Sequence, residues 1–329
     1  MFYLGIDVAK AKIDCCLILE NSASKKKTKT FSNMPKGFEQ LQTWLNHHAA
    51  SSTQTIILME ATSIYHERLV KYLFDAGYQV CVTNPARARY FAQSMSKLNK
   101  TDKADSEVLA RFAMTADLHF WQPLPKHIQL LNALLDRRAV LCEDLQREKN
   151  RLEKAESTFT IEPVLQSIHK SIKQLNKHIQ DIDQQIDDHI DQNPDLKNDK
   201  ELLSSIPAIA DRTSLLMLSF LRSHSFERAS QAAAFVGLVP IQRQSGSSIH
   251  GRSRLSKAGS SKIRAGLYMA AIVATRHNPH IKEMNERLLA NGKTKMMAIG
   301  AAMRKLVHLC YGVLKHQQPY QENYCINSQ

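Results

Sequence analysis

Apolar residues in the first part of the chain come in short runs that predict strands. Runs at 2–8, 13–19 and roughly 27–32 are separated by tight connections, a pattern typical of an antiparallel meander. Pro35 then opens a stretch in which apolar residues recur three and four positions apart, through Phe38 and beyond. That spacing predicts an amphipathic helix packed on the strands.

The order of the following elements favours one fold class. A strand at 55–60, a helix ending at Gly77, a strand around 80–82 and a basic helix leading to Thr101 complete this part of the chain. Three strands followed by alternating helices and strands is the order of the α/β RNase H-like fold. In that topology the first and fourth strands are neighbours, so their ends should lie side by side.

Residues 126–195 change to a heptad-like pattern. In the second half of this stretch, apolar residues alternate three and four apart for over three heptads. A polar stretch around 157–160 and Pro163 separate the two halves. We expect a helical hairpin or a long coiled-coil arm, and the regularity favours pairing of subunits over two helices that pack only on each other. The apolar positions are 131, 134, 141, 145, 152 and 155 in the first half, and 165, 168, 172, 175, 179, 182 and 186 in the second.

The last part of the chain is predicted to be mostly helical. Residues 202–210 have the outline of a helix-hairpin-helix element, but Ala208 and Ala210 stand where that motif normally carries glycine, which favours a scaffold role over a DNA contact. A loop rich in Ser, Gly and basic residues follows Pro240. Further helices are expected from about Ser261, at 264–276 and at 295–315, before a loose tail. Three domains result, at 1–125 (RNase H-like), 126–195 (coiled coil) and 196–329 (mostly helical).

The charge balance indicates a polyanionic partner. The chain has 329 residues and a formal charge of +13 from 44 Lys and Arg against 31 Asp and Glu. From Arg228 to Lys282 there is no acidic residue but there are nine Lys or Arg, so this segment alone carries +9. Such a stretch favours nucleic acid over a membrane surface as the partner, although many basic runs are only solvated faces.

Cysteine usage and hydropathy indicate a reducing, aqueous compartment. The six cysteines form no CxxC pair, and no histidines stand at zinc-ligand spacing, which argues against a zinc site. The N-terminus has no signal-peptide pattern and no run reaches 18 apolar residues. We expect a cytoplasmic protein, associated with the nucleoid when active, with no membrane partner.

Four acidic residues stand where strand ends and a helix start could bring them together. Asp7 and Glu60 each close an apolar strand run, and Asp102 and Asp105 stand three apart at the head of a helical stretch. Each alone is most often a turn residue, a solvated strand end or a favourable acid at a helix start. Four clustered carboxylates, however, would repel one another without a cation. Their oxygens suit Mg²⁺, and two such ions about 3.5–4 Å apart serve phosphodiester cleavage and joining.

Ser245 is a second candidate for chemistry, within a basic and serine-rich segment. A serine hydroxyl is a poor nucleophile unless a base or cation assists it, and nearby arginines can hold a phosphate. A Ser-Gly-Ser-Ser run is otherwise most often a flexible loop. The basic side chains expected to contact nucleic acid are Arg243, Arg252, Arg254, Lys257, Lys262 and Arg264.

Long segments of the chain resemble one family. At the N-terminal end they are LGIDVAKAKID, IILMEATSIY, LFDAGYQVCVTNPARARYFAQS and LNKTDKADSEVLARF; at the C-terminal end they are LLSSIPAIADRTS, AAFVGLVPIQRQSGSSIHGRSRLSKAGSSKIRAGLYMAA and AAMRKLVHLCYGVLK. With these segments the chain resembles the DEDD transposases of the insertion-sequence-110 family, whose best-studied members are bridge-RNA-guided recombinases and whose relatives include pilin-gene invertases. The resemblance covers nearly the whole chain.

The resemblance implies a fold and a mechanism. The N-terminal domain would be an RNase H fold of the Holliday-junction-resolvase type, with Asp7, Glu60, Asp102 and Asp105 as Mg²⁺ ligands. Ser245 would attack DNA and become covalently joined to it, in a site shared between the subunits of a dimer or tetramer. Donor and target DNA would be exchanged through a Holliday junction, and a non-coding bridge RNA would read both by base pairing while the protein grips backbone and shape.

Three alternatives remain open from the sequence. A protein-only DNA invertase would use the same residues without RNA. A metal-dependent junction-resolving nuclease would need the four acids but not Ser245. A non-enzymatic nucleic-acid-binding dimer would need neither, but four acids on a binding face would repel phosphate unless a metal were bound.

Overall fold

The structure is a computed structural model. It describes residues 1–19, 25–95, 102–115, 117–241, 244–245, 249–250 and 254–322; of residues 102, 103, 244, 245, 249 and 250 it describes the backbone but not the side chains. The chain divides into two compact units, Met1–Pro123 and Leu124–Gln329. Each unit has a hydrophobic core of its own and is described separately.

A five-stranded mixed sheet forms the centre of the first unit. Its strands are β1 (Phe2–Val8), β2 (Lys12–Leu19), β3 (Lys26–Ser32), β4 (Thr55–Glu60) and β5 (Gln79–Thr83), in the order β3-β2-β1-β4-β5. β1, β2 and β3 form an antiparallel meander, whereas β4 runs parallel to both β1 and β5. The predicted strands and the predicted adjacency of the first and fourth are therefore confirmed.

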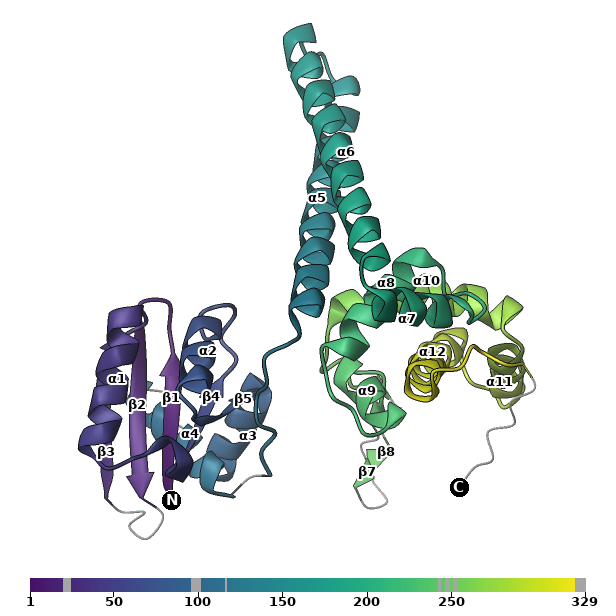
Figure 1. The fold of residues 1–329 in the computed structure, drawn as a ribbon. Helices are drawn as coiled ribbons and strands as arrows, with labels where there is room; N and C mark the ends of the chain where they lie inside the picture. Colours follow the sequence, from purple (N-terminus) through teal and green to yellow (C-terminus); the bar gives the residue numbers. More distant parts are fainter. Residues whose placement is uncertain are drawn as a thin grey trace. The chain divides into compact units, whose positions relative to one another are not determined.

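Helices cover both faces of this sheet (Figure 1). One face packs on α1 (Pro35–His47) and α2 (Glu67–Asp75), in a core that includes Leu41 and Leu73. The other face packs on α3 (Pro85–Ser94) and α4 (Asp102–Thr115), in a smaller core around Leu109 and Phe112. A short 3-10 turn, η2 (Ser52–Gln54), leads into β4. β1, β2 and β4 are buried on both faces, which accounts for their apolar runs, whereas the edge strand β3 is mostly exposed.

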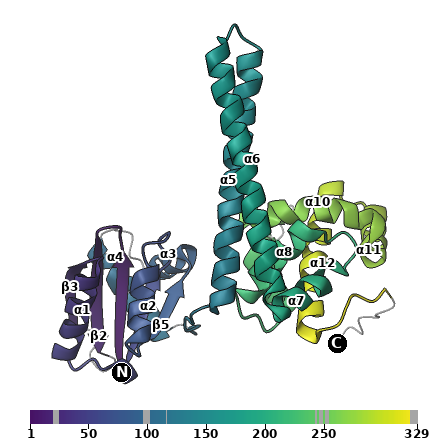
Figure 2. The ribbon, with the colours of Figure 1, turned by 45° about the horizontal axis from the view of Figure 1, so that its top comes forward.

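Two long helices, α5 (Lys126–Glu156) and α6 (Glu162–Asp191), form a hairpin arm in the second unit (Figure 2). The predicted heptad positions lie along their contact: Leu131 and Leu141 are buried, and the other seam residues of α5 are half-buried. In α6 the positions from 165 to 182 are half-buried and Ile186 is buried. The seam from which subunit pairing was predicted thus packs on the neighbouring helix of the same chain. Pairing between subunits stays a prediction.

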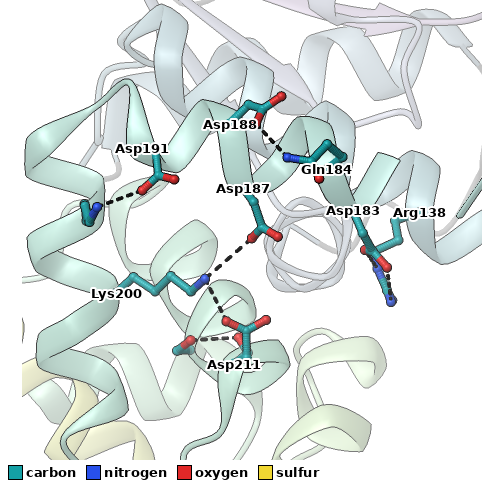
Figure 3. Close-up of polar contacts among 10 residues, drawn as sticks. Arg138, Asp183, Gln184, Asp187, Asp188, Asp191, Lys200 and Asp211 are labelled. Carbon is teal, nitrogen blue, oxygen red and sulfur yellow. Dashed lines mark hydrogen bonds and ion pairs between the residues drawn. The ribbon is translucent and has the colours of Figure 1, made fainter. Parts of the chain in front are cut away.

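Ion pairs reinforce the base of this arm (Figure 3). Arg138 of α5 makes a two-point contact with Asp183 of α6. Lys200 lies between Asp187 of α6 and Asp211 of the next helix pair, with Nζ–Oδ1 distances of 3.8 and 2.7 Å. Below them, apolar residues of both arm helices join the core of the second unit. The arm is therefore anchored at one end by both charge and packing.

Six helices complete the second unit: α7 (Pro194–Ser204), α8 (Asp211–Arg222), α9 (Ala229–Val236), α10 (Ser261–His277), α11 (Pro279–Ala290) and α12 (Lys295–His316). α12 lies at the centre and buries nine residues. Among the described helices it alone is long and apolar enough to cross a membrane, but half of its most apolar window is buried in the unit. Its composition is that of a core helix.

The turn between α7 and α8 matches the predicted helix-hairpin-helix outline. Ile206 and Ile209 are buried in the core, which supports the scaffold interpretation. Ala208 has a φ of +82°, a left-handed conformation that glycine adopts without strain. The backbone therefore has the shape for which the motif normally supplies glycine, although the residue is alanine.

Short strand pairs replace the predicted loop after Pro240. β6 (Pro240–Ile241) pairs with β9 (Arg254–Leu255), and β7 (Gln244–Ser245) pairs with β8 (Ile249–His250), both antiparallel. We call these two antiparallel pairs, at the described residues 240–241, 244–245, 249–250 and 254–255, the ribbon; β7 and β8 lie past α9 (Figure 1). Strands of two residues leave no alternation for a sequence pattern to detect.

Candidate active site

Asp7 and Glu60 lie at the same edge of the sheet. Ile6 of β1 pairs in parallel with Met59 of β4, so the next residues, Asp7 and Glu60, leave neighbouring strands at the same level. On the other side of β4, Glu60 pairs with Thr83 of β5. Parallel strands end together at one edge, which is where α/β proteins place polar functional groups.

Both acids also lie on the same face. In β1, Leu4 and Ile6 belong to the core with α1 and α2, whereas Tyr3 packs against α4. Successive side chains point to opposite faces, so Asp7 shares the α4 face with Tyr3. In β4, Leu58 packs on the α4 side, so Glu60 lies on that face as well. Register and alternation together bring the two carboxylates to one place.

α4 brings the remaining acids toward them. A Cβ at Gly5 would lie 2.0 Å from the carbonyl oxygen of Ser106 and 2.3 Å from the nitrogen of Ala110, so only glycine allows this approach. The later residues of α4 pack on Tyr3, so the helix begins toward Asp7. Asp102 is its first residue and the half-buried Asp105 follows one turn on.

The donor atoms at this edge of the sheet are those of a possible metal centre. Its predicted ligands are all carboxylates, a donor set that suits Mg²⁺. Among the side chains that the structure describes, no group of three or more His, Cys, Asp or Glu is close enough to hold a metal ion. The side chain of Asp102 lies outside the described set. Asp7 and Glu60 share an edge and a face of the sheet, and Asp105 lies on the helix that covers that face. The role of all four acids as metal ligands stays a prediction.

Sequence reasoning missed a fifth carboxylate at this edge. Asp14 of β2 lies directly opposite Asp7 in the antiparallel pair and is only 5% exposed. Its carboxylate accepts a hydrogen bond from Thr30 Oγ1 at 2.5 Å and pairs with Lys12 Nζ at 3.0 Å. The sequence pattern that could have revealed it is an acidic residue inside an apolar strand run, directly after Ile13. A buried negative charge next to Asp7 makes this edge more attractive to a cation.

Nearby groups are committed to other contacts. Glu107 of α4 is buried and pairs with Lys26 at 2.5 Å and with Arg111 at 2.9 Å. Burial, with the charge of Asp14 next in importance, raises the pKa of the Cys15 thiol well above its usual value. Cys15 therefore stays protonated at neutral pH and is unsuited to act as a nucleophile. The cysteines within the described residues are all free thiols.

α3 also begins at this edge. It follows directly on Thr83, the partner of Glu60, and the Asn84 side chain caps it by accepting a hydrogen bond from Ala86 N. Arg87 lies over the Phe112 ring of α4 at 5.6 Å, which ties the two helices of this face together. The predicted basic helix is confirmed over Pro85–Ser94, whereas Lys97 and Thr101, to which it was expected to lead, lie outside the described residues.

Ser245 belongs to the second unit. It lies in the β7–β8 pair opposite Ile249, away from the helical core. The structure describes its backbone and not its side chain, and Arg243 and Arg252 lie outside the described residues. What the structure provides is a ribbon that carries Ser245 beyond α9 (Figure 1).

The basic side chains flanking this ribbon differ in their surroundings. Arg254 in β9 and Lys257 after it are exposed, as expected for residues that contact a phosphate backbone. Lys262 is exposed too and pairs with Asp136 at 2.6 Å. An exposed pair of this kind contributes little to stability, so Lys262 can exchange it for a phosphate.

Arg264 has a structural role that the sequence did not suggest. It is half-buried, and its Nη1 donates to the carbonyl oxygens of Val236 at 2.9 Å and Gly259 at 2.7 Å. It therefore holds the end of α9 to the segment that follows the ribbon. Arg264 was predicted to contact nucleic acid, but its guanidinium already donates hydrogen bonds to these two backbone carbonyl oxygens.

Comparison with known proteins agrees with this geometry. Residues 4–158 match the family model of a transposase, and residues 200–286 match that of the transposase IS116/IS110/IS902 family. The chain is 32% identical to the pilin gene-inverting proteins of Moraxella bovis and Moraxella lacunata over 97% of its length and 98% of theirs. It is also 26% identical to an IS110 insertion-element protein of Streptomyces coelicolor, over 36% of this chain and 30% of that protein.

Proposed function

Because the chain belongs to the IS110 family of transposases, whose activity is transposition or inversion of DNA, we propose that it recombines DNA with a metal site at the carboxyl edge of its sheet. The proposed ligands of Mg²⁺ are Asp7, Glu60, Asp102 and Asp105. One observation carries the assignment: Asp7 and Glu60 are adjacent in register and share the face from whose helix the other two acids arise. The strand order β3-β2-β1-β4-β5 supports an RNase H-like fold for this unit.

The residues present suit this role chemically. Bound Mg²⁺ would neutralise phosphate charge and polarise the scissile phosphodiester. Asp7 and Glu60 come from strands held on both sides by backbone pairing, so their positions are fixed without ligand. Asp102 and Asp105 come from a helix held against Gly5 by close packing. A rigid frame of this kind positions ligands better than loops do.

Ser245 is the proposed nucleophile. Its Oγ would form a bond to phosphorus as the bond from phosphorus to the departing DNA strand breaks, and its proton would leave with the strand's hydroxyl. One phosphoester replaces another, so the reverse reaction can rejoin a new strand without an outside energy source. Placement on a projecting ribbon supports this role, because the serine can reach a strand held elsewhere.

The active assembly is proposed to be a dimer or tetramer in which the acids of one subunit act with Ser245 of another. The arm supports this proposal through its exposed flank. Most seam residues of α6 are only half-buried against α5, so a second copy could cover them further. Two helices alone cannot enclose a seam, whereas four can.

A guide RNA is the finer part of the proposal. The segment from Arg228 to Lys282, without an acid and with nine Lys or Arg, supports backbone contact with nucleic acid but cannot separate RNA from DNA. The pilin gene-inverting relatives, which align over 97% of this chain, favour DNA inversion as a candidate reaction, and a protein-only invertase is the second candidate. A nuclease that merely hydrolyses DNA would have no use for Ser245.

The test is to express the chain together with its native flanking DNA, purify it, and sequence any RNA that accompanies it. One discrete RNA with segments complementary to the DNA ends and the insertion site is the expected result for guided recombination. If DNA binding is intact and no discrete RNA is recovered, guidance is overturned and the protein-only invertase stands. A variant with Arg254→Ala and Lys257→Ala, purified in parallel, shows how much RNA is held by charge alone.

A further inference from the structure

A cavity in the second unit lies away from the ribbon and has no part in the function proposed above. Its volume is about 430 Å³, within the usual range of small-ligand sites. It lies between the second half of α12, the starts of α9 and α11, and the segment that follows α12. We call it the α12 cavity, and six of its lining residues define it: Arg228, His280, His308, Tyr311, Gly312 and Tyr320.

Gly312 is the first sign that the α12 cavity is kept open. It lies well inside α12, where glycine is the least favourable residue after proline. A Cβ built on Gly312 meets no atom within 4 Å, so no close packing requires the glycine. By contrast, Gly300 in the same helix has the Leu255 side chain 3.2 Å from its Cβ position. Because residue 312 has no side chain, space is left on the side of α12 that lines the cavity.

His308 supplies an unused hydrogen-bonding group. It lines the cavity one turn before Gly312, and its Nε2 is buried without a hydrogen-bond partner among the described residues. Burial, and after it the charges of Arg304 and Lys305, lowers the pKa of the imidazole. His308 is therefore neutral at pH 7. A buried polar atom without a partner is costly. Nε2 has almost no accessible surface, so a ligand supplies the missing bond when the imidazole turns toward the cavity that His308 lines.

The walls of the cavity are aromatic and fixed in place. Tyr320 donates its backbone N–H to Ser205 Oγ at 2.8 Å, and its hydroxyl contacts the buried Asn278 at 3.3 Å. The His280 ring stands edge-on to the Tyr320 ring, with centroids 5.7 Å apart. Tyr311 is held from its other end, where its hydroxyl donates to the Phe226 carbonyl at 2.9 Å.

Charge at the rim selects for an anion. Arg228 and Lys315 are exposed there, against the single acid Glu227 among the described lining residues. Lys315 lies over the Tyr311 ring at 5.5 Å. Arg228 and His280 both come from the acid-free segment 228–282. A ligand that fits has a planar aromatic body, a hydrogen-bonding edge and an attached negative charge.

We infer that the α12 cavity binds one unpaired nucleotide of a nucleic-acid strand. The base lies between the aromatic wall and the open side of Gly312, an edge of the base bonds His308 Nε2, and the phosphate faces Arg228 and Lys315. The inference rests on the proposed function only in taking its ligand from the nucleic acid that the chain handles. Recombination exposes unpaired bases where strands separate, and a pocket for one such base would hold the opened strand.

The experiment uses the full chain and two DNA duplexes that differ by one feature. One carries a single 2-aminopurine bulge and the other is the same duplex fully paired; matching RNA duplexes form a second arm. Affinity is measured by fluorescence anisotropy at fixed salt, and stacking by 2-aminopurine emission. The expected preference for the bulged duplex is about tenfold, the value of one stacked base.

A size series at one position tests the cavity itself. Gly312→Ala adds a single carbon in free space and should keep the preference, whereas Gly312→Leu should fill the cavity and remove it. The Cβ that both changes add meets no atom within 4 Å, and both replace a glycine inside a helix. The melting temperature of Gly312→Ala should therefore be unchanged or higher, and that of Gly312→Leu shows whether the longer side chain is accommodated. His308→Leu should lower the preference severalfold without filling the space, which keeps the test informative if Gly312→Leu does not fold.

Equal affinity for bulged and paired duplexes in the wild-type chain would overturn the inference, and so would a preference that survives in Gly312→Leu. A preference seen only with DNA or only with RNA names the strand. The readout is binding, so it does not depend on recombination. A chain that fails to recombine can pass this test, and one that recombines can fail it.

Discussion

Asp7 and Glu60 continue the parallel pair of Ile6 and Met59, so the two carboxylates leave adjacent strands at one edge and on one face of the sheet. Their side chains are half-buried, and the buried Asp14 lies opposite Asp7 on β2, the neighbour of β1 on the side away from β4. Such a concentration of negative charge costs stability unless a cation or donor offsets it. Thr30 and Lys12 do so for Asp14. Mg²⁺ is the proposed partner of the others.

Ser245→Ala should eliminate any covalent protein–DNA adduct, because no hydroxyl is then present to form the phosphoester. The adduct is measured by trapping the reaction with denaturant and separating protein-linked DNA on a gel. Ser248→Ala, in the same serine-rich segment, is the matched control and should keep the adduct. An adduct that persists in Ser245→Ala would move the nucleophile to another residue.

Arg254→Ala and Lys257→Ala should weaken DNA binding across all sequences, since both side chains are exposed beside the ribbon. Each lost phosphate contact should reduce the slope of log affinity against log salt by about 1. Affinity is measured between low and moderate salt, with Lys170→Ala on the arm as control. An unchanged slope would show that Arg254 and Lys257 are solvated and do not contact phosphate.

Arg264→Ala should behave differently from those two variants. Its guanidinium holds the carbonyls of Val236 and Gly259, so its loss should destabilise the second unit by about 1–3 kcal/mol. The salt slope of DNA binding should change little. Thermal unfolding and a salt titration of the same preparation check both points. A reduced slope with unaltered stability would restore Arg264 as a phosphate contact.

Ala208→Gly should stabilise the chain by about 1 kcal/mol, because Ala208 is held at a φ of +82°. Chemical denaturation of the two chains side by side measures the difference. Ala265→Gly, at an exposed position inside α10, is the control and should destabilise by a similar amount. Equal destabilisation by both changes would contradict the strained turn.

His308 predicts a pH effect on stability. Burial, with Arg304 and Lys305, lowers its pKa in the folded chain below the ordinary value of 6.5. The unfolded chain therefore binds the proton first, and the free energy of unfolding should fall as the pH drops below 6.5 toward the folded pKa. His308→Leu should remove that part of the decline. Melting temperatures at pH 7.5 and 5.5 measure it, and an identical decline in both chains would exclude His308 as the cause.

Most of the sheet could be predicted because β1, β2 and β4 are buried on both faces. Apolar runs such as Phe2–Val8 mark the strands themselves, and the order of elements places the first beside the fourth. Asp14 escaped notice because a single acid inside a strand is usually solvated, and only the register shows that it lies opposite Asp7. The periodicity of apolar residues predicts which face of a strand is buried, whereas the residue opposite on the next strand is known only from the structure.

The arm shows the same limit in another form. Heptad spacing from Leu165 to Ile186 correctly predicts a helix with an apolar seam. The spacing does not determine whether a helix of the same chain or of a second copy packs on that seam. α11 escaped prediction because Ile281 is its one buried residue, so its apolar stripe is weak even though Asn278 and Pro279 signal its start. The ribbon of Ser245 has strands too short for any pattern.

The most direct measurement of the central claim is strand exchange on a plasmid carrying the native flanking DNA, with Mg²⁺ and any RNA that the chain requires, comparing the wild-type chain with Asp7→Asn. We expect recombined plasmid with the wild-type chain and none detectable with Asp7→Asn, while DNA affinity is retained. Loss of a residue that only supports a metal ligand typically costs about 10–100-fold, so the loss at a direct ligand should be larger. Recombination by Asp7→Asn at the wild-type rate would contradict the metal site at the edge of the sheet.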